Sequence, residues 1–437
     1  MWTASRYYQS LHLWSNINKS YIRYKKLTIT EFEIVVIYTI LIFLKYFEIL
    51  RIVVVSDNFG QSSQFKTISH AYGFEDVGIV PGEITINPDQ TDLSVYIGEY
   101  KLDIPVLASA MDAVMSPEYA ILMSQMGGLG VLNLEGIYSR YEDYHEIIDR
   151  IVNSDATQAT NLMQEIYAQP IREELIAVRI KQIKDQGAIC AVSFTPQNAK
   201  RLAPVAVDAG ADLVVIQATV TTARHLSKSN VGLNFDTLKE IVKVPLLVGN
   251  CASFGAAKEL MNCGIDGLLV GVGPGAACTT REVVGVGVPQ VTATMECAAA
   301  REQYYNDSGK YVPIFTDGGI RTGGDLCKSI ASGADGVMIG TPFAQTEEAI
   351  GRGFNWGMAT PHPALPRGIR INAGVKGSIK QLLYGPSSRT DGTQNLIGAL
   401  EVGMGMCGAY NIKEMQQADL VIAPSIRTEG KIFQHSM

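Results

Sequence analysis

Eight short apolar runs, each followed by a stretch with a helical pattern, most limit how this chain can fold. Buried parallel strands appear in a sequence as short, continuously apolar segments, and the stretches between these runs are long enough for helical crossovers. Eight such repeats predict an α/β fold, a (β/α)8 TIM barrel that forms a single catalytic domain. A doubly wound parallel sheet is the alternative. The runs lie at 104–109, 129–134, 188–193, 212–216, 245–249, 267–271, 312–316 and 336–340.

Helices are expected between these strands. Three tripeptides, Gly-Ala-Asp at 210–212 and 333–335 and Gly-Ile-Asp at 264–266, indicate similar returns from a helix to a strand. Each one places glycine as the helix C-cap just before the next strand. The expected helices are 117–126, 141–151, 171–186, 196–209, 235–242, 254–263, 292–305 and 323–332.

Composition excludes several classes of protein. A hydrophobic content of 47%, a charged content of 18% and 42 glycines are typical of a compact α/β enzyme. A net charge of −7 argues against nucleic acid as a general partner. The seven cysteines are scattered and include no Cys-x-x-Cys pair, so the sequence predicts neither a disulfide framework nor a zinc site. We therefore expect reduced thiols and a cytoplasmic protein.

The first 70 residues differ from the rest of the chain. They contain 13 of the 35 aromatic residues but only one of the 42 glycines. The apolar run 34–44 is shorter than the roughly 20 residues that a bilayer span needs. The segment is interpreted as an anchor-like extension helix, a targeting segment, or upstream sequence from a wrongly assigned start. The last is favoured, because the composition changes just before Tyr72. We expect residues 71–437 to form the catalytic domain and no membrane contact by that domain.

A glycine-rich loop that ends in a cysteine is the most informative local feature. Residues 271–281 read Gly-Val-Gly-Pro-Gly-Ala-Ala-Cys-Thr-Thr-Arg. Glycines at alternate positions let backbone groups approach a ligand without interference from Cβ atoms. The spacing matches neither a P-loop nor a dinucleotide-binding fingerprint. The loop follows the sixth predicted strand, so it is expected at the catalytic end of the barrel.

Other polar and glycine residues follow the remaining strands. Loops after strands seven and eight of such barrels commonly bind phosphate. Glycine amides can donate to phosphate oxygens there, and a carboxylate can accept from a ribose diol. The residues that the predicted register places at this end are Ser109, Met111, Asn250, Cys278, Asp317, Gly318, Gly319, Gly340 and Thr341.

These motifs, in this order, resemble the IMP dehydrogenase/GMP reductase family. The resemblance is carried by Ser-Ala-Met-Asp at 109–112, the loop 271–281, Pro-Gln at 289–290, Asp-Gly-Gly-Ile at 317–320 and Gly-Met-Ala at 357–359. It runs from about Tyr72 to Phe433 and is strongest to a short branch related to IMP dehydrogenase. It implies a (β/α)8 barrel that acts on a purine nucleotide (IMP or GMP) with a nicotinamide cofactor, NAD or NADP. The family is usually tetrameric, so we expect a homotetramer, with an octamer as an alternative.

The resemblance also implies a role for individual residues. Cys278 would add to C2 of the purine, a hydride would pass to NAD⁺, and water would hydrolyse the resulting thioimidate. Thr280 would position the water, and Arg367 would activate it. Phosphate would lie on Gly318, Gly319, Gly340 and Thr341, ribose on Ser109 and Asp317, and the base along Met111, Gly357, Met358 and Ala359. Ala276 stands where the family has a phosphate-binding serine, so one hydroxyl donor is missing.

Cofactor and cation positions follow from the same resemblance. The cofactor would contact Gln217, Asn250, Gly271 and Gly273. A potassium ion would bind the carbonyls of Gly273, Gly275 and Cys278, together with Glu429, Gly430 and Lys431 of a neighbouring subunit. A plain C-terminal turn is the alternative for this last segment.

Three departures from the family are visible. Only about 50 residues separate Leu134 from Ala188, too few for the pair of regulatory nucleotide-binding (CBS) modules that many relatives insert there. Gln217 replaces an aspartate expected near the cofactor ribose. Arg367 stands where the reductase has its catalytic glutamate.

The third departure favours one of the two activities. Without the glutamate, Thr280 has no acid/base partner for reductive deamination, which favours oxidation of IMP to XMP over NADPH-dependent reduction of GMP. By contrast, the local sequences Cys-Thr-Thr-Arg at 278–281 and Gly-Val-Gly at 285–287 resemble those of the reductase more closely. A non-catalytic nucleotide-binding protein and a flavin-dependent barrel are further alternatives.

Overall fold

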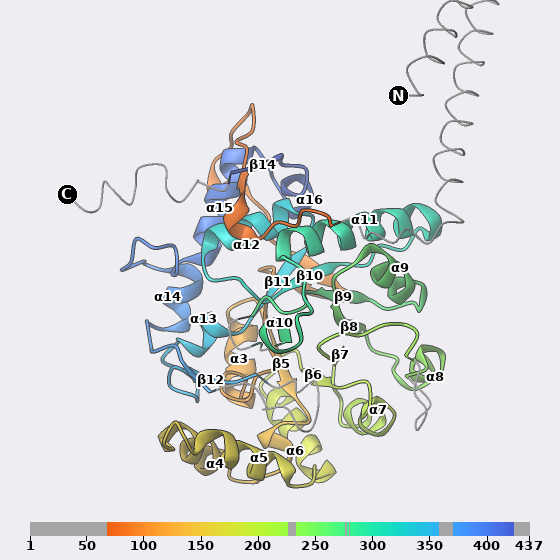
Figure 1. Cartoon of the computed structure of the whole chain (residues 1–437), viewed down its shortest axis with the longest axis vertical. Helices are drawn as coiled ribbons and strands as arrows, with labels where there is room; N and C mark the ends of the chain where they lie inside the picture. The colour runs from red at the N-terminus through yellow and green to blue at the C-terminus, as the bar shows by residue number, and fades with distance from the viewer. Residues whose placement is uncertain (1–67, 226–232, 276–277, 279, 358–369, 424–437) are drawn as a thin grey trace, which may run out of the picture. The chain divides into compact units, whose positions relative to one another are not determined.

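The computed structural model describes residues 68–225, 233–275, 278, 280–357 and 370–423. The chain divides after Ser69, and every element described below belongs to the second unit, His70–Met437. Figure 1 shows this unit, with helices around a central set of strands. Within the described ranges, no helix is both long enough and apolar enough to cross a membrane.

Eight parallel strands close into a barrel, in the order β10-β11-β4-β5-β6-β7-β8-β9. Closure is visible in the register, because β11 pairs with β4 through Ile339 and Ala108, and β10 pairs with β9 through Thr316 and Val270. A doubly wound sheet would have two open edges, so this alternative is wrong. The strands are β4 Val106–Ala108, β5 Leu129–Asn133, β6 Ala191–Phe194, β7 Leu213–Gln217, β8 Leu246–Cys251, β9 Gly267–Val270, β10 Ile314–Asp317 and β11 Gly336–Ile339.

Alternating side chains divide the apolar residues between two cores. Leu213 and Val215 of β7 join a cluster inside the barrel, whereas Val214 and Ile216 face the surrounding helices. Side chains on both faces of the strands are buried, which explains why each strand is continuously apolar. Two short strands, β2 Val95–Ile97 and β3 Tyr100–Leu102, add side chains to the inner cluster. This hairpin lies at the N-terminal end of the barrel, because Gly98 packs against Pro245 just before β8.

Helices follow most of the strands and cover the barrel from outside. Proline or a side-chain cap begins several of them: Ser116 caps α3 with Pro117 in its first turn, and Thr322 forms a capping box with Asp325 in α12. The helices after β4 to β11 are α3 Pro117–Gln125, α4 Tyr144–Asn153, α5 Ala159–Ala168, α6 Glu173–Lys184, α7 Ala199–Asp208, α8 Phe235–Ile241, α9 Phe254–Asn262, α10 Thr280–Val284, α11 Gln290–Ser308, α12 Gly323–Ala331 and α13 Thr341–Ala344.

The remaining strands and helices are not part of the barrel itself. β1 Val77–Ile79 pairs with β14 Leu420–Ile422, and β12 Phe354–Asn355 pairs with β13 Ile371–Asn372, both antiparallel. Helices α14 Ile379–Tyr384, α15 Leu396–Cys407 and α16 Ile412–Met415 complete the described chain. The pair β12–β13 flanks residues 356–370 and therefore holds the two ends of that segment side by side.

All eight predicted strands and the eight predicted helices are present, with ends shifted by up to a few residues. The largest shift among the strands is at β6, which begins at Ala191 rather than at residue 188. The helix α5 was not expected, and it forms with α4 an additional layer between β5 and β6. The stretch between β5 and β6 is occupied by the short 3-10 helix η3 Ile137–Ser139 and by α4, α5 and α6, which agrees with the expected lack of a regulatory module.

Candidate active site at the barrel mouth

Three strands place a polar side chain at the same point of the barrel mouth. Gln217 ends β7, Asn250 lies near the end of β8, and Asp317 ends β10. The amide nitrogens of Gln217 and Asn250 both donate to Oδ2 of Asp317, each at 2.8 Å. Gln217 also donates to Oδ1 of Asn250 at 3.0 Å. These residues are far apart in sequence, and only barrel closure brings them together.

Asp317 is the ionisable member of this cluster. Burial raises the pKa of Asp317 to about 6, and the hydrogen bonds from Asn250 and Gln217 oppose that rise by stabilising the carboxylate. Both amides use the same oxygen, and no donor from the described residues contacts Oδ1. Asp317 therefore keeps one carboxylate oxygen available as an acceptor at the mouth.

The cysteine loop begins in a tightly packed position. A Cβ atom on Gly271 would lie 2.3 Å from the carbonyl oxygen of Asp317, so this position admits only glycine. Gln290, the first residue of α11, donates to the carbonyl of Val270 at 2.6 Å. Gly318 and Gly319 pack under Pro274, with positive φ angles of 88° and 81°. The loops after β9 and β10 therefore support each other.

The cysteine itself lies at the start of α10. Its Sγ is 3.4 Å from Oγ1 of Thr280, and its amide donates to the carbonyl of Gly275 at 3.0 Å. Cys278 is half-buried, whereas Thr280 is buried. The thiol is thus accessible, and the nearby hydroxyl is held in one place. The structure thus brings together the two residues of this loop for which the resemblance implies a catalytic role.

The predicted phosphate positions differ in what they can donate. The amide of Gly318 already donates to the carbonyl of Met338 at 3.3 Å. No described carbonyl accepts from the amides of Gly319 or Gly340. Oγ1 of Thr341 accepts from Nδ2 of Asn355 at 3.1 Å, so its own proton can be donated to a ligand. Among the predicted phosphate positions, Gly319, Gly340 and Thr341 are therefore the ones whose donor is not used by a described residue.

Ser109 and Met111 lie beside Gly340. A Cβ atom on Gly340 would be 2.7 Å from Sδ of Met111 and 3.5 Å from Oγ of Ser109. This close approach joins the loops after β4 and β11.

Two further predicted positions are glycines of the described chain. Gly357 follows the buried Trp356, at the end of a described segment. Gly273 has a φ of 81° and packs on Arg281.

Several predicted positions lie outside the described residues. They are Ala276, Met358, Ala359, Arg367, Glu429, Gly430 and Lys431. Of the predicted cation ligands, Gly273, Gly275 and Cys278 belong to the described loop. Carbonyl oxygens are suitable ligands for a hard cation, so this half of the predicted site fits potassium chemically.

Sequence reasoning missed a buried network behind the mouth. Asp112 is fully buried, and its Oδ2 accepts from the amide of Ile137 at 2.6 Å and from the hydroxyl of Tyr167 at 2.7 Å. The indole nitrogen of Trp356 donates to the same hydroxyl at 2.8 Å. Tyr167 comes from the unexpected helix α5, so no pattern near residue 112 could have identified it.

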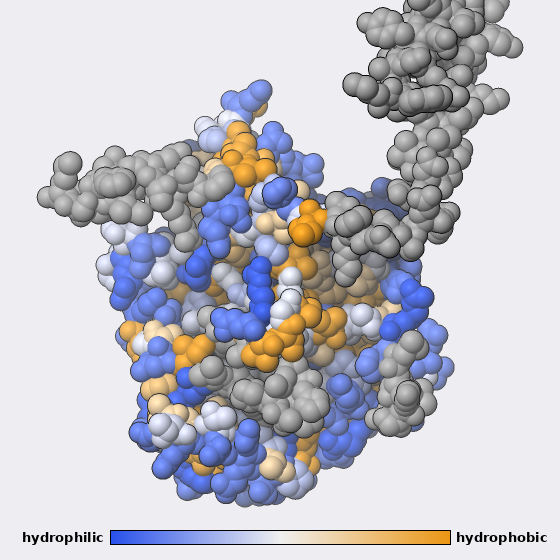
Figure 2. Space-filling view, viewed as in Figure 1, coloured by the Kyte–Doolittle hydropathy of each residue, from blue (hydrophilic) through white to orange (hydrophobic). Residues whose placement is uncertain are grey.

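The surface around the mouth is mixed in character. Figure 2 shows an apolar patch over α10, where Val283, Val284 and Val286 are exposed.

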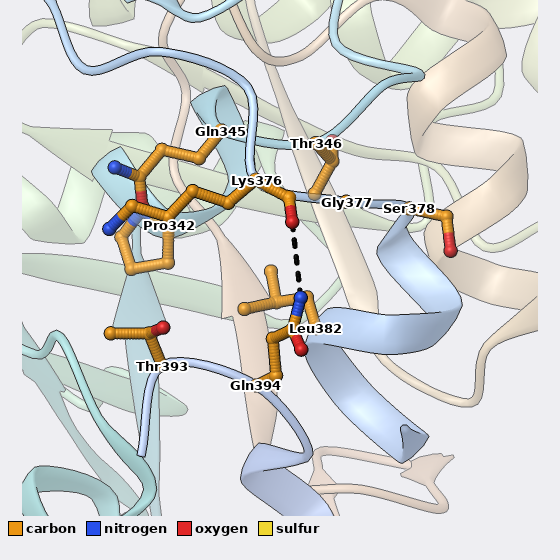
Figure 3. Close-up of a pocket in the computed structure, with 9 residues that line it drawn as sticks. All are labelled: Pro342, Gln345, Thr346, Lys376, Gly377, Ser378, Leu382, Thr393 and Gln394. Atoms are coloured by element: carbon orange, nitrogen blue, oxygen red, sulfur yellow. Dashed lines mark hydrogen bonds between the residues drawn. The ribbon is translucent and has the colours of Figure 1, made fainter. Parts of the chain in front are cut away.

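A small pocket beyond α13, lined by residues such as Gln345, Lys376 and Gln394, appears in Figure 3. Its volume of about 10 Å³ suits a single water at most. It is therefore too small for a nucleotide.

The chain is similar to several known proteins. The family described as "IMP dehydrogenase / GMP reductase domain" matches residues 71–430. An uncharacterized oxidoreductase from Mycolicibacterium smegmatis is 38% identical over 366 residues, which cover 82% of this chain and 98% of the relative. Inosine-5'-monophosphate dehydrogenase from Methanocaldococcus jannaschii is 29% identical, with coverages of 82% and 94%.

A solved structure is also similar to this chain. It is the crystal structure of an IMP dehydrogenase/GMP reductase-like protein from Corynebacterium glutamicum. The TM-score is 0.77 at 35% sequence identity, and the match covers 84% of this chain and 97% of the other.

Proposed function

Because the chain belongs to the IMP dehydrogenase/GMP reductase domain family, we propose that this oxidoreductase converts IMP to XMP with NAD⁺ as hydride acceptor. The observation that carries the proposal is the pair of Cys278 and Thr280, 3.4 Å apart at the mouth of the barrel. A protein that only binds nucleotides needs neither an accessible thiol nor a hydroxyl beside it.

The reaction would proceed in two steps. The thiolate of Cys278 adds to C2 of the purine and forms a C–S bond, while the C2 hydride leaves for the nicotinamide ring. Water then adds to the same carbon of the thioimidate, the C–S bond breaks, and the thiolate is released. The sum is IMP, NAD⁺ and water giving XMP, NADH and a proton. Thr280 would hold the attacking water, and Arg367 is proposed to activate it.

The nucleotide would lie across the loops after β4, β10 and β11. Its phosphate would accept from the amides of Gly319 and Gly340 and from the hydroxyl of Thr341. One ribose hydroxyl would donate to Oδ1 of Asp317, the oxygen that the two amides leave open. The base would lie along Met111 and Gly357, which places C2 toward Cys278.

The cofactor would occupy the side of the mouth formed by β7 and β8. Gln217 and Asn250 are the polar groups there, and a nicotinamide cofactor would supply the hydride acceptor when bound. The amide nitrogen of Gln217 is already engaged by Asp317 and Asn250, so its carbonyl oxygen is the group left for a cofactor hydroxyl. NADP remains the alternative, and potassium and a homotetramer belong to the same proposal.

GMP reduction is the second candidate, because the local sequence of the loop is closer to the reductase. Gly287 has a packing reason of its own, however. A Cβ atom there would lie 2.8 Å from the carbonyl of Val272, and Gly285 has a φ of 70°. These glycines are required by the loop whichever reaction it serves, so they do not favour the reductase.

Absorbance at the nicotinamide band distinguishes the two activities. Purified full-length protein is incubated with IMP and NAD⁺, and separately with GMP and NADPH. We expect NADH to appear in the first mixture and NADPH to persist in the second. Consumption of NADPH with GMP would assign the reductase instead, and no change in either mixture would contradict both.

A further inference from the structure

The hydroxyl of Tyr167 links two segments that approach the proposed base site from different parts of the chain. It donates to Oδ2 of Asp112 at 2.7 Å and accepts from the indole nitrogen of Trp356 at 2.8 Å. Asp112 directly follows Met111, and Trp356 directly precedes Gly357. A single buried oxygen atom thus joins the immediate neighbours of two residues proposed to contact the base.

Each member of this chain of hydrogen bonds is held firmly. Asp112 and Trp356 have no exposed surface, and Tyr167 is 8% exposed. The hydroxyl of Tyr138 donates to the backbone carbonyl of Asp112 at 2.7 Å. Gly136 leaves room for the carboxylate, because a Cβ atom there would lie 2.0 Å from Oδ1 of Asp112. Buried hydrogen-bond networks of this kind make the surrounding structure more rigid.

Helix α4, which packs against the helix α5 that supplies Tyr167, also contacts the residues next to β12 and β13. Arg352, just before β12, forms an ion pair with Asp149 of α4 at 2.7 Å. Arg370, just before β13, donates to the hydroxyl of Ser154 at 2.9 Å. The layer formed by α4 and α5, at the lower end of the view in Figure 1, therefore contacts both ends of segment 352–370.

We propose that Tyr167 is a positioning residue for nucleotide recognition, which keeps Met111 and Gly357 at the separation that a purine base requires. The proposal rests on the proposed function for the identity of the ligand. It adds a role for the α4–α5 layer, which supplies a structural support for the base site.

Tyr167→Phe removes the linking oxygen and little else. We expect the Kd for IMP to rise about tenfold, the order expected for one buried hydrogen bond. The value of kcat at saturating IMP and the KM for the cofactor should change less than threefold. Tyr141→Phe is the matched control, because its hydroxyl donates to the carbonyl of Ile166 at 3.1 Å within the same layer. This control should leave IMP binding unchanged.

Tryptophan fluorescence gives a direct readout in the full-length chain. The three tryptophans are residues 2, 14 and 356, so Trp2→Phe with Trp14→Phe leaves Trp356 as the single probe. IMP should change its emission in this background, and Tyr167→Phe should alter both the emission and its quenching by acrylamide. Should Tyr167→Phe not fold, Trp356→Phe in the natural background breaks the same chain of hydrogen bonds and should also weaken IMP binding.

Hydrogen exchange without nucleotide separates this inference from the proposed function. Tyr167→Phe should accelerate amide exchange in residues 109–115 and 352–357, and Tyr141→Phe should not. Unchanged exchange and unchanged IMP affinity in Tyr167→Phe would overturn the positioning role. Failure of the parent protein to bind IMP, with exchange affected as expected, would instead count against IMP as the ligand.

Discussion

At the scale of single residues, the mouth of the barrel combines a half-buried thiol, Cys278, with a half-buried carboxylate, Asp317. Cys278 is supported by the glycine loop and contacts Thr280. Asp317 is restrained by two amides that share one of its oxygens. In the proposed reaction the thiol forms the covalent bond and the carboxylate binds the ribose, so substitutions at Cys278 and Asp317 should separate turnover from binding.

Cys278→Ala should reduce kcat to background while IMP still binds, because the thiolate forms the bond but contributes little to ground-state affinity. Stopped-flow absorbance should show no burst of NADH, and the melting temperature should stay within a few degrees of the parent. Substantial residual turnover would remove the covalent intermediate from the mechanism.

Asp317→Asn should weaken nucleotide binding but stabilise the fold at high pH. The folded pKa of about 6 exceeds the ordinary value of 3.8, so the ionised carboxylate costs stability above pH 6. The asparagine variant should therefore gain about 1–3 kcal/mol in free energy of unfolding at pH 8. This gain should shrink as the pH falls from 6 toward 4, where the parent carboxyl becomes protonated.

Denaturant titrations at pH 8 and pH 4.5 measure this difference. A variant that is less stable than the parent at pH 8 would show that the two amides outweigh the cost of burial. The same titration should appear in the parent enzyme as a loss of IMP affinity below pH 6, because a protonated Asp317 accepts less well.

At the scale of elements, the cysteine loop depends on its neighbours. Its first glycine faces the carbonyl of Asp317, its proline covers Gly318 and Gly319, and Gln290 of α11 binds the residue before it. The loop is therefore positioned by β10 and α11 as much as by β9. A substitution at the first residue of the loop, Gly271, should therefore displace the thiol of Cys278 although the two residues are not in contact.

Gly271→Ala tests this dependence. The added Cβ would overlap the Asp317 carbonyl, and a φ of 149° is unfavourable for alanine, so we expect a loss of about 2–4 kcal/mol and a large loss of kcat. Gly255→Ala in α9 is the control, because nothing lies within 4 Å of its Cβ position. That variant should be neutral or slightly more stable. Equal melting temperatures for the two variants would contradict this packing.

At the scale of the whole molecule, the proposed cation site and the N-terminal segment each lead to a prediction. The described half of the proposed cation site consists of carbonyls from one loop, and the other half is proposed to come from a neighbouring subunit. The first 70 residues differ in composition from everything that follows.

Potassium should raise kcat, and deletion of residues 428–437 should remove that response, because Glu429 and Gly430 would complete the site in trans. Steady-state rates in potassium, sodium and lithium chloride at equal ionic strength provide the measurement. Equal rates in all three salts would exclude a selective cation site.

Deletion of residues 1–60 should leave kcat, KM and the number of subunits in the assembly unchanged, because the barrel elements all follow residue 70. Activity assays and analytical ultracentrifugation provide the comparison. Loss of activity, solubility or assembly in the shortened protein would show that the segment contributes to the catalytic unit.

Much of the barrel and part of the site could be predicted without coordinates. The apolar runs identified all eight barrel strands because both faces of a parallel barrel strand are buried, which leaves a strong local signal. Element ends were less accurate: α11 extends to Ser308, beyond the expected residue 305, because Gly309 provides its left-handed cap. Helix α5 was not predicted, although its buried residues Ala159, Met163, Ile166 and Tyr167 follow the spacing of an amphipathic helix.

The sequence by itself determined the barrel, the family and the cysteine loop, because each depends on patterns local to a few residues. Only the tertiary structure decided that Gln217 and Asn250 share one oxygen of Asp317, and that Tyr167 joins Asp112 to Trp356. These contacts connect residues separated by 55 to 189 positions. Hydrogen bonds across such separations exist only once strands and loops have closed around the core, so no local pattern can reveal them.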